Sequence, residues 1–232
     1  MSGVPIGVVR FPGTNCDQDV FQAVLAVAGA SPVWLWHKER DLAGVRGIVL
    51  AGGFAFGDYL RAGAIARFSP IMEQVIRFAE SGGPVLGICN GFQILTEAGL
   101  LPGALMRNDR LTFVCREQWL RVESVATPYT RHSRPGQLVR YPVAHGEGNY
   151  VADEAALDRL EGEGRVVFRY VDEAGAATPA ANPNGSARGI AGIVNEGGNV
   201  LGLMPHPDRA MSLLVGSDDG RGVFRGLVEA AA

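Results

Sequence analysis

The chain has 232 residues, of which 47% are hydrophobic and 19% are charged, and its formal net charge is −3 at pH 7. This length is enough to bury a substantial core, so we treat residues 1–232 as a single domain. The slightly acidic balance, without any run of basic residues, gives no reason to expect binding to nucleic acid.

The chain also lacks the usual marks of secretion or membrane insertion. Its longest apolar stretch, residues 21–36, is interrupted by Gly29, Ser31 and Pro32 and is too broken to span a bilayer. The N-terminus does not resemble a signal peptide, and three cysteines do not indicate a disulfide framework. We therefore expect a cytoplasmic protein that does not contact a membrane.

In chain order, short apolar runs alternate with segments of helical spacing. The run at residues 6–9 ends in Phe11-Pro12-Gly13, and the good N-cap residues that follow predict a helix. Alternating strands and helices predict an α/β fold whose mostly parallel sheet is covered on both faces. The further strands are expected at 33–36, 47–50 and 84–88, and the further helices at 70–80 and 91–98.

After about residue 105 this alternation stops, and the pattern instead favours added strands of an antiparallel region. Two strands are expected at 111–115 and 119–125, joined by a short polar link. A second pair is expected at 189–194 and 200–204, and the chain closes with a helix over 223–232.

Cys89 is the residue that best fits a catalytic nucleophile. Gly87-Ile88-Cys89-Asn90-Gly91 matches the G-x-C-x-G pattern of a nucleophile elbow, between a predicted buried strand and a predicted helix. The turn is so tight that side chains at the two glycine positions would collide. The helix N-terminus favours a thiolate, and the N–H of Asn90 is free to donate to an oxyanion. The alternative is a buried structural cysteine.

The other two cysteines fit structural roles better. Cys115 ends an apolar run and is expected to be a buried core thiol. Cys16 also lies near a predicted helix start, but Asp17 beside it would raise the pKa of the thiol. No glycines bracket Cys16, so we expect it to be structural or to line the pocket.

A cysteine nucleophile needs a histidine to move its proton, and the histidine needs a partner that fixes its ring. His206 follows an apolar strand, lies between two prolines and has Asp208 two residues later. A residue before proline favours extended geometry, so the side chains of His206 and Asp208 should point the same way. This arrangement predicts His206 as the base and Asp208 as its partner.

The remaining histidines are weaker candidates. His37 and His132 lie in polar segments and are expected at the surface. His145 has Glu147 two residues later, the same spacing as His206 and Asp208, but lies in a glycine-rich segment that indicates a mobile loop. We expect His145 and Glu147 near a subunit contact or the mouth of the site.

Gly52-Gly53 follows a predicted buried strand, and such glycines let backbone N–H groups approach a ligand and stabilise an oxyanion. Two glycines alone are equally compatible with a simple turn. A phosphate-binding loop is not expected, because G-x-x-x-x-G-K-[ST] is absent.

Together these segments resemble the class I glutamine amidotransferases, and most closely the glutaminase subunits of purine biosynthesis. The resemblance spans almost the whole chain. It rests on the elbow with Phe92 and Gln93, on residues 11–17, 52–63, 144–148 and 182–186, and on Met204-Pro205-His206-Pro207.

This resemblance implies a three-layer, flavodoxin-like amidotransferase domain with a Cys89–His206–Asp208 triad. Cys89 would attack the side-chain amide of glutamine, and N–H groups at Gly53 and Asn90 would hold the oxyanion. Gln93 would help to bind the substrate. The family usually has glutamate where this chain has Asp208, and aspartate is shorter by one methylene.

The resemblance also implies that the ammonia passes to a separate synthetase subunit. That subunit would use ATP and Mg²⁺ to convert formylglycinamide ribonucleotide to its amidine, and a small third subunit would bridge the two. No cofactor and no metal are expected in this chain. Two other functions stay open on the residues alone: a free-standing cysteine hydrolase or peptidase, and a regulatory or scaffold subunit without catalysis.

Overall fold

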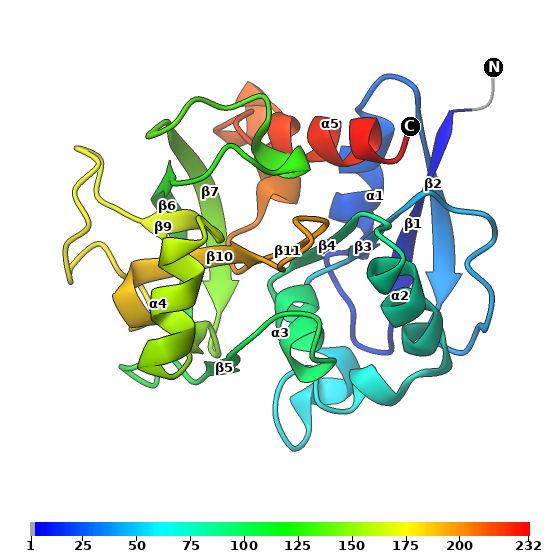
Figure 1. Cartoon of the computed structure of the whole chain (residues 1–232), viewed down its shortest axis with the longest axis horizontal. Coiled ribbons are helices and arrows are strands. Elements are labelled where there is room, and N and C mark those ends of the chain that lie inside the picture. Colours follow the sequence, from blue (N-terminus) through cyan, green and yellow to red (C-terminus); the bar gives the residue numbers. More distant parts are fainter. Residues whose placement is uncertain (1–2) are drawn as a thin grey trace.

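A computed structural model describes residues 3–232, and its first half follows the predicted alternation of strands and helices (Figure 1). Apolar runs form the strands, and every residue of β3 and β4 is buried. Helix α2 begins with Pro70 at a position where proline is well tolerated. The elements are β1 (Val4–Arg10), α1 (Asp17–Leu25), β2 (Ala30–Trp36), β3 (Gly47–Leu50), α2 (Pro70–Glu80), β4 (Val85–Ile88) and α3 (Asn90–Glu97).

The second half supplies most of the antiparallel strands. The predicted pair at 189–194 and 200–204 is confirmed as β10 and β11, which pair antiparallel. The two strands expected at 111–115 and 119–125 are instead one continuous strand, β6, so that prediction was wrong. The elements are β5 (Ala104–Met106), β6 (Val114–Val122), β7 (Leu138–His145), β8 (Asn149–Val151), α4 (Glu154–Gly162), β9 (Val166–Tyr170), β10 (Ile190–Val194), β11 (Val200–Leu203) and α5 (Arg221–Ala230).

Nine strands form one sheet in the order β2-β1-β3-β4-β11-β10-β9-β6-β7. The five strands from β2 to β11 pair parallel, and the pairs from β11 to β7 are antiparallel. Figure 1 shows α1 and α5 on one face of the central strands and α2 and α3 on the other. This three-layer arrangement confirms the predicted fold class.

The central strands β4 and β11 lie side by side and carry the two main candidate residues. Cys89 follows the carboxyl end of β4, and His206 follows the carboxyl end of β11 shortly after it. The backbone N–H of Cys89 donates to the carbonyl of Leu203 at 2.8 Å. Open α/β sheets hold their chemistry at this edge, so the parallel register brings the two residues together.

Candidate active site

Cys89 occupies a strained turn between β4 and α3. Its φ of 53° and ψ of −107° are unusual for a residue with a side chain, and strain of this kind concentrates at functional sites. A Cβ on Gly87 would lie 2.7 Å from the carbonyl oxygen of Gly91, and one on Gly91 would lie 2.0 Å from that of Leu50. The close packing predicted for the two glycines is therefore confirmed.

His206 is buried, and its ring lies against Asp208. Its Nδ1 is 3.2 Å from Oδ1 of Asp208, and its backbone N–H donates to the carbonyl of Pro142 in β7 at 2.8 Å. Nε2 has no hydrogen-bond partner among residues 3–232. Burial lowers the pKa of His206, but the neighbouring Asp208 and Cys89 outweigh that effect and raise it to about 10.

The path of the chain between His206 and Asp208 differs from the extended geometry that we expected. Pro207–Arg209 form a single 3-10 turn, and only His206 keeps a partly extended backbone, with φ −103° and ψ 89°. The turn carries the shorter aspartate side chain back toward the imidazole. The contact between the two side chains is therefore made by the turn rather than by alternation along a strand.

Gly52 packs between the candidate residues. A Cβ at this position would lie 2.8 Å from Cε1 of His206, 3.2 Å from Sγ of Cys16 and 3.4 Å from Cβ of Cys89. The loop after β3 thus passes so close to the nucleophile and the histidine that a side chain does not fit. This contact gives the first glycine of the pair a steric reason that the sequence did not reveal.

Gly53 and Asn90, the two residues expected to donate to an oxyanion, both lie close to Cys89, Gly53 in the lining of the same cavities and Asn90 as its neighbour in the chain. Gly53 has a φ of 150° and pairs with Thr14 in an isolated bridge, and Asn90 is the first residue of α3. Among residues 3–232 neither N–H has a hydrogen-bond acceptor. The Asn90 side chain also accepts from the N–H of Ala55 at 3.1 Å, which ties the loop to the helix.

Gln93 is buried, and both ends of its amide are engaged with the protein. Its Nε2 donates to the carbonyl of Glu147 at 2.5 Å, and its Oε1 accepts from Nδ2 of Asn90 at 2.9 Å. The side chain therefore holds the segment after β7 against α3. Its expected role in substrate binding stays a prediction, because both hydrogen bonds that it forms are to the protein.

Two small cavities adjoin Cys89. One of about 220 Å³, which we call the His206 cavity, is also lined by Cys16 and Arg209. The other, of about 160 Å³, we call the Glu147 cavity. It shares Gly53, Phe54, Cys89, Phe113 and Ala144 with the first cavity and is also lined by Asp58, Gln93, His145, Gly146 and Glu147.

Cys16 lines the His206 cavity, which agrees with the expectation that it is structural or lines the pocket. Its thiol is poorly suited to act as a nucleophile. Burial has the largest effect on this thiol, and together with the charge of Asp208 it raises the pKa of Cys16 to about 12. Asp17, which we expected to cause such a shift, instead pairs with Arg10 at 2.6 Å. Arg209 donates to the sulfur at 3.1 Å.

Three sequence predictions about cysteine and histidine were wrong. Cys115 is exposed rather than a core thiol, because β6 begins at Val114 and presents this position to solvent. His37 is buried and lies 3.4 Å from the hydroxyl of Ser69. His145 is buried at the end of β7 rather than in a mobile loop. His132 is paired with Glu229 at the surface, as expected.

The surroundings of His145 keep it neutral. Burial, reinforced by the nearby His206, lowers the pKa of His145 to about 4. Its Nε2 lies 3.4 Å from Nδ2 of Asn184, whose side chain also donates to the carbonyl of Gly148 at 2.8 Å. Asn184 thus supports the ring of His145, a role that nothing in the neighbouring sequence indicates.

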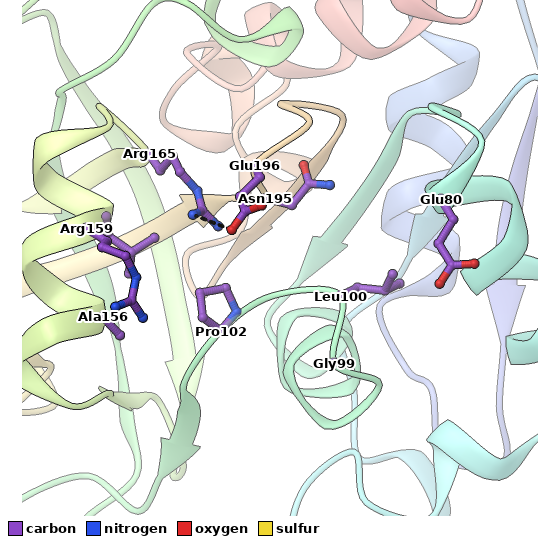
Figure 2. Close-up of a pocket in the computed structure, with 10 residues that line it drawn as sticks. Glu80, Gly99, Leu100, Pro102, Ala156, Arg159, Arg165, Asn195 and Glu196 are labelled. Carbon is purple, nitrogen blue, oxygen red and sulfur yellow. Dashed lines mark ion pairs between the residues drawn. The ribbon is translucent and has the colours of Figure 1, made fainter.

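Another cavity, of about 410 Å³, lies away from these residues. Figure 2 shows it between α4, the end of α3 and the turn that joins β10 to β11, where Arg165 pairs with Glu196. Glu80 at its rim precedes the amino end of β4, whereas Cys89 follows the carboxyl end. Because α/β sheets hold their chemistry at carboxyl ends, we assign catalysis to the cavities beside Cys89.

Within residues 3–232, no group of three or more metal-ligating side chains is placed to hold an ion. None of the helices in this range is long and apolar enough to cross a membrane.

The chain is similar to known proteins along nearly its whole length. Residues 4–219 match the family described as the CobB/CobQ-like glutamine amidotransferase domain. The chain is 56% identical over 222 residues to the phosphoribosylformylglycinamidine synthase subunit PurQ of Salinibacter ruber, covering 96% of this chain and 94% of the relative. It is 57% identical over 223 residues to the subunit of the same name from Moorella thermoacetica, again covering 96% and 94%.

A solved structure described as PurLQS from Thermotoga maritima contains a chain of the same fold. Its TM-score is 0.86 and its sequence identity 41%, and the match covers 99% of each chain. Given the matched family over residues 4–219 and relatives above 50% identity along nearly the whole chain, this chain belongs to the CobB/CobQ-like glutamine amidotransferase family.

Proposed function

We propose that this chain is the glutaminase subunit of a phosphoribosylformylglycinamidine synthase, and that it releases ammonia from glutamine for a synthetase subunit. The observation that carries the chemistry is the juxtaposition of Cys89, strained at the end of β4, with the buried His206–Asp208 pair at the end of β11. The names of the relatives support the choice of complex.

In this proposal, Cys89 attacks the side-chain amide carbon of glutamine from the start of α3. The developing oxyanion accepts from the N–H groups of Gly53 and Asn90, which have no other acceptor among residues 3–232. His206 carries the proton and gives it to the departing nitrogen, which leaves as ammonia. Water, deprotonated by the same imidazole, then hydrolyses the glutamyl thioester.

Asp208 orients the imidazole and stabilises its charged form. Its carboxylate lies 3.2 Å from Nδ1 of His206, so the proton on Nδ1 points at Asp208 and leaves Nε2 for catalysis. The turn over Pro207–Arg209 provides this reach with an aspartate. The shorter side chain is therefore compatible with the proposed role.

The proposal assigns no cofactor to this chain. ATP and Mg²⁺ would act in the synthetase, which would convert formylglycinamide ribonucleotide to formylglycinamidine ribonucleotide, and a small subunit would bridge the two. We place the complex in the cytoplasm, where free cysteines such as Cys16 and Cys89 stay reduced.

The test is glutamine hydrolysis by the purified chain, measured alone and with its synthetase partner. We expect turnover that rises strongly when the partner is present, with one ammonia released per glutamine. Equal turnover of unrelated amides or peptides without a partner would favour a free-standing hydrolase. An assembled complex that never hydrolyses glutamine would favour a non-catalytic subunit.

A further inference from the structure

Two carboxylates from different segments line the Glu147 cavity beside the nucleophile. Asp58 ends the turn Ala55–Asp58, has a left-handed φ of 54° and is half-buried. Glu147 follows β7, and its side chain is 26% exposed. The backbone of each segment is tied to α3, through Asn90 for the first and Gln93 for the second. The two acids are therefore fixed parts of the cavity rather than solvated surface groups.

The negative charge of this pair is poorly neutralised. Asp58 accepts only from Nδ2 of Asn90, at 3.4 Å, and forms no ion pair among residues 3–232. Glu147 has one cation near it, Arg107 at 3.7 Å, and that side chain is 77% exposed. Burial and the charge of Glu147 raise the pKa of Asp58 to about 6. A cation placed between the two carboxylates would relieve this repulsion.

His145, which also lines this cavity, has one ring nitrogen without a partner among the described residues. The side chain of His145 is 3% exposed, and its Nδ1 has no hydrogen bond among residues 3–232. Asn184 turns its amide nitrogen toward Nε2, because its Oδ1 accepts from Ser186 at 2.7 Å. The neutral ring of His145 therefore carries its proton on Nδ1. The cavity itself offers two carboxylates, which suit a cationic group such as the ammonium of an amino acid.

We propose that Asp58 and Glu147 bind the α-ammonium group of glutamine and thereby select the free amino acid over other primary amides. This inference rests on the proposed glutaminase function. Two methylene groups separate the amide carbon of glutamine from its α-carbon, so the charged end must lie near Cys89. A glutamine within a peptide chain has a neutral amide in place of the ammonium, and it would forfeit this interaction.

The experiment compares glutamine with glutaramate, which is glutamine without the α-amino group, in the complex with the synthetase. We expect Asp58→Asn to lower kcat/KM for glutamine by about 10- to 100-fold, mainly through KM, since one charge-assisted hydrogen bond is lost. The same variant should change kcat/KM for glutaramate by about twofold or less. Glu147→Gln should behave likewise and serves if Asp58→Asn does not fold.

Glu73→Gln is the matched control, because Glu73 lies on α2 with its side chain 58% exposed and does not line the cavity. It should leave both substrates unaffected. An equal loss on glutamine and glutaramate would overturn the inference, because it would mean that the acids only support the local structure. Unchanged kinetics on glutamine would overturn it as well. Failure of the wild-type complex to hydrolyse glutamine would instead refute the proposed function, so the two failures are distinct.

Discussion

Gly52 offers a steric test of the active site that removes none of the reacting groups. In Gly52→Ala the added Cβ would start 2.8 Å from Cε1 of His206, whereas ordinary carbon contacts begin near 3.4 Å. The imidazole must therefore move by about 0.6 Å unless the loop gives way. The backbone of Gly52 is not left-handed, so alanine brings no conformational strain of its own.

Such a displacement should act on turnover more than on folding. Because a misplacement of about 1 Å can cost about 100-fold in rate, we expect kcat for glutamine to fall by about 10- to 100-fold. The assay is steady-state ammonia release by the complex, together with thermal unfolding of the isolated chain.

Gly162→Ala is the matched control for this substitution. Gly162 ends α4, its backbone is not left-handed, and an added Cβ there would meet nothing within 4 Å. It should leave turnover unchanged. If Gly52→Ala folded normally and turned glutamine over at the wild-type rate, the assigned relation between Cys89 and His206 would be refuted.

Three further predictions concern His206, Asp208 and His145. His206→Ala should lower kcat by about 100-fold or more, whereas His145→Ala should act mainly on KM, and the opposite order would make His145 the base. Asp208→Asn should lower kcat by about 100-fold or more at unchanged KM, and full activity would exclude its orienting role. The third concerns the free energy of unfolding between two pH values. The upper one, 6.5, is the ordinary pKa of histidine, and the lower one, about 4, is the pKa of His145 in the folded chain. Within this range His145 binds a proton in the unfolded chain but not in the folded one. The free energy of unfolding of the wild type should therefore fall by up to about 3 kcal/mol through this residue as the pH drops. Chemical denaturation should show a weaker decline for His145→Gln, and equal declines would mean that this histidine is not buried neutral.

Local patterns were sufficient for the elements that present the nucleophile. The apolar run before Cys89, with a glycine on either side of the elbow, predicted β4, the turn and α3 to within one or two residues. The physical reason is that both the strand and the tight turn depend on neighbouring residues in the chain. The same holds for the helix over 70–80, whose predicted bounds agree with Pro70–Glu80.

Strand β7 was missed although its residues alternate between buried and partly exposed. Pro142 in its middle is unusual for a strand, because proline has no N–H to donate to a neighbouring strand. In the structure β7 is the last strand of the sheet, and an edge strand tolerates proline. The carbonyl of Pro142 accepts from the N–H of His206, so this overlooked strand helps to position the candidate base.

Long-range contacts account for most of the remaining errors. The glycines around His145 suggested mobility, but a Cβ on Gly148 would lie 2.5 Å from the ring of His145, so this glycine permits tight packing instead. Asp58 joins the Glu147 cavity through a loop with left-handed residues at Phe56 and Asp58. Neither relation has a signature in nearby sequence, since each depends on where distant segments meet.

The most direct test of the central claim uses Cys89→Ala in the complex with the synthetase and measures amidine synthesis from two nitrogen sources. If this chain supplies ammonia through Cys89, synthesis from glutamine should be abolished, while synthesis from added ammonium salt should continue at the wild-type rate. Persistent synthesis from glutamine in this variant would contradict the account.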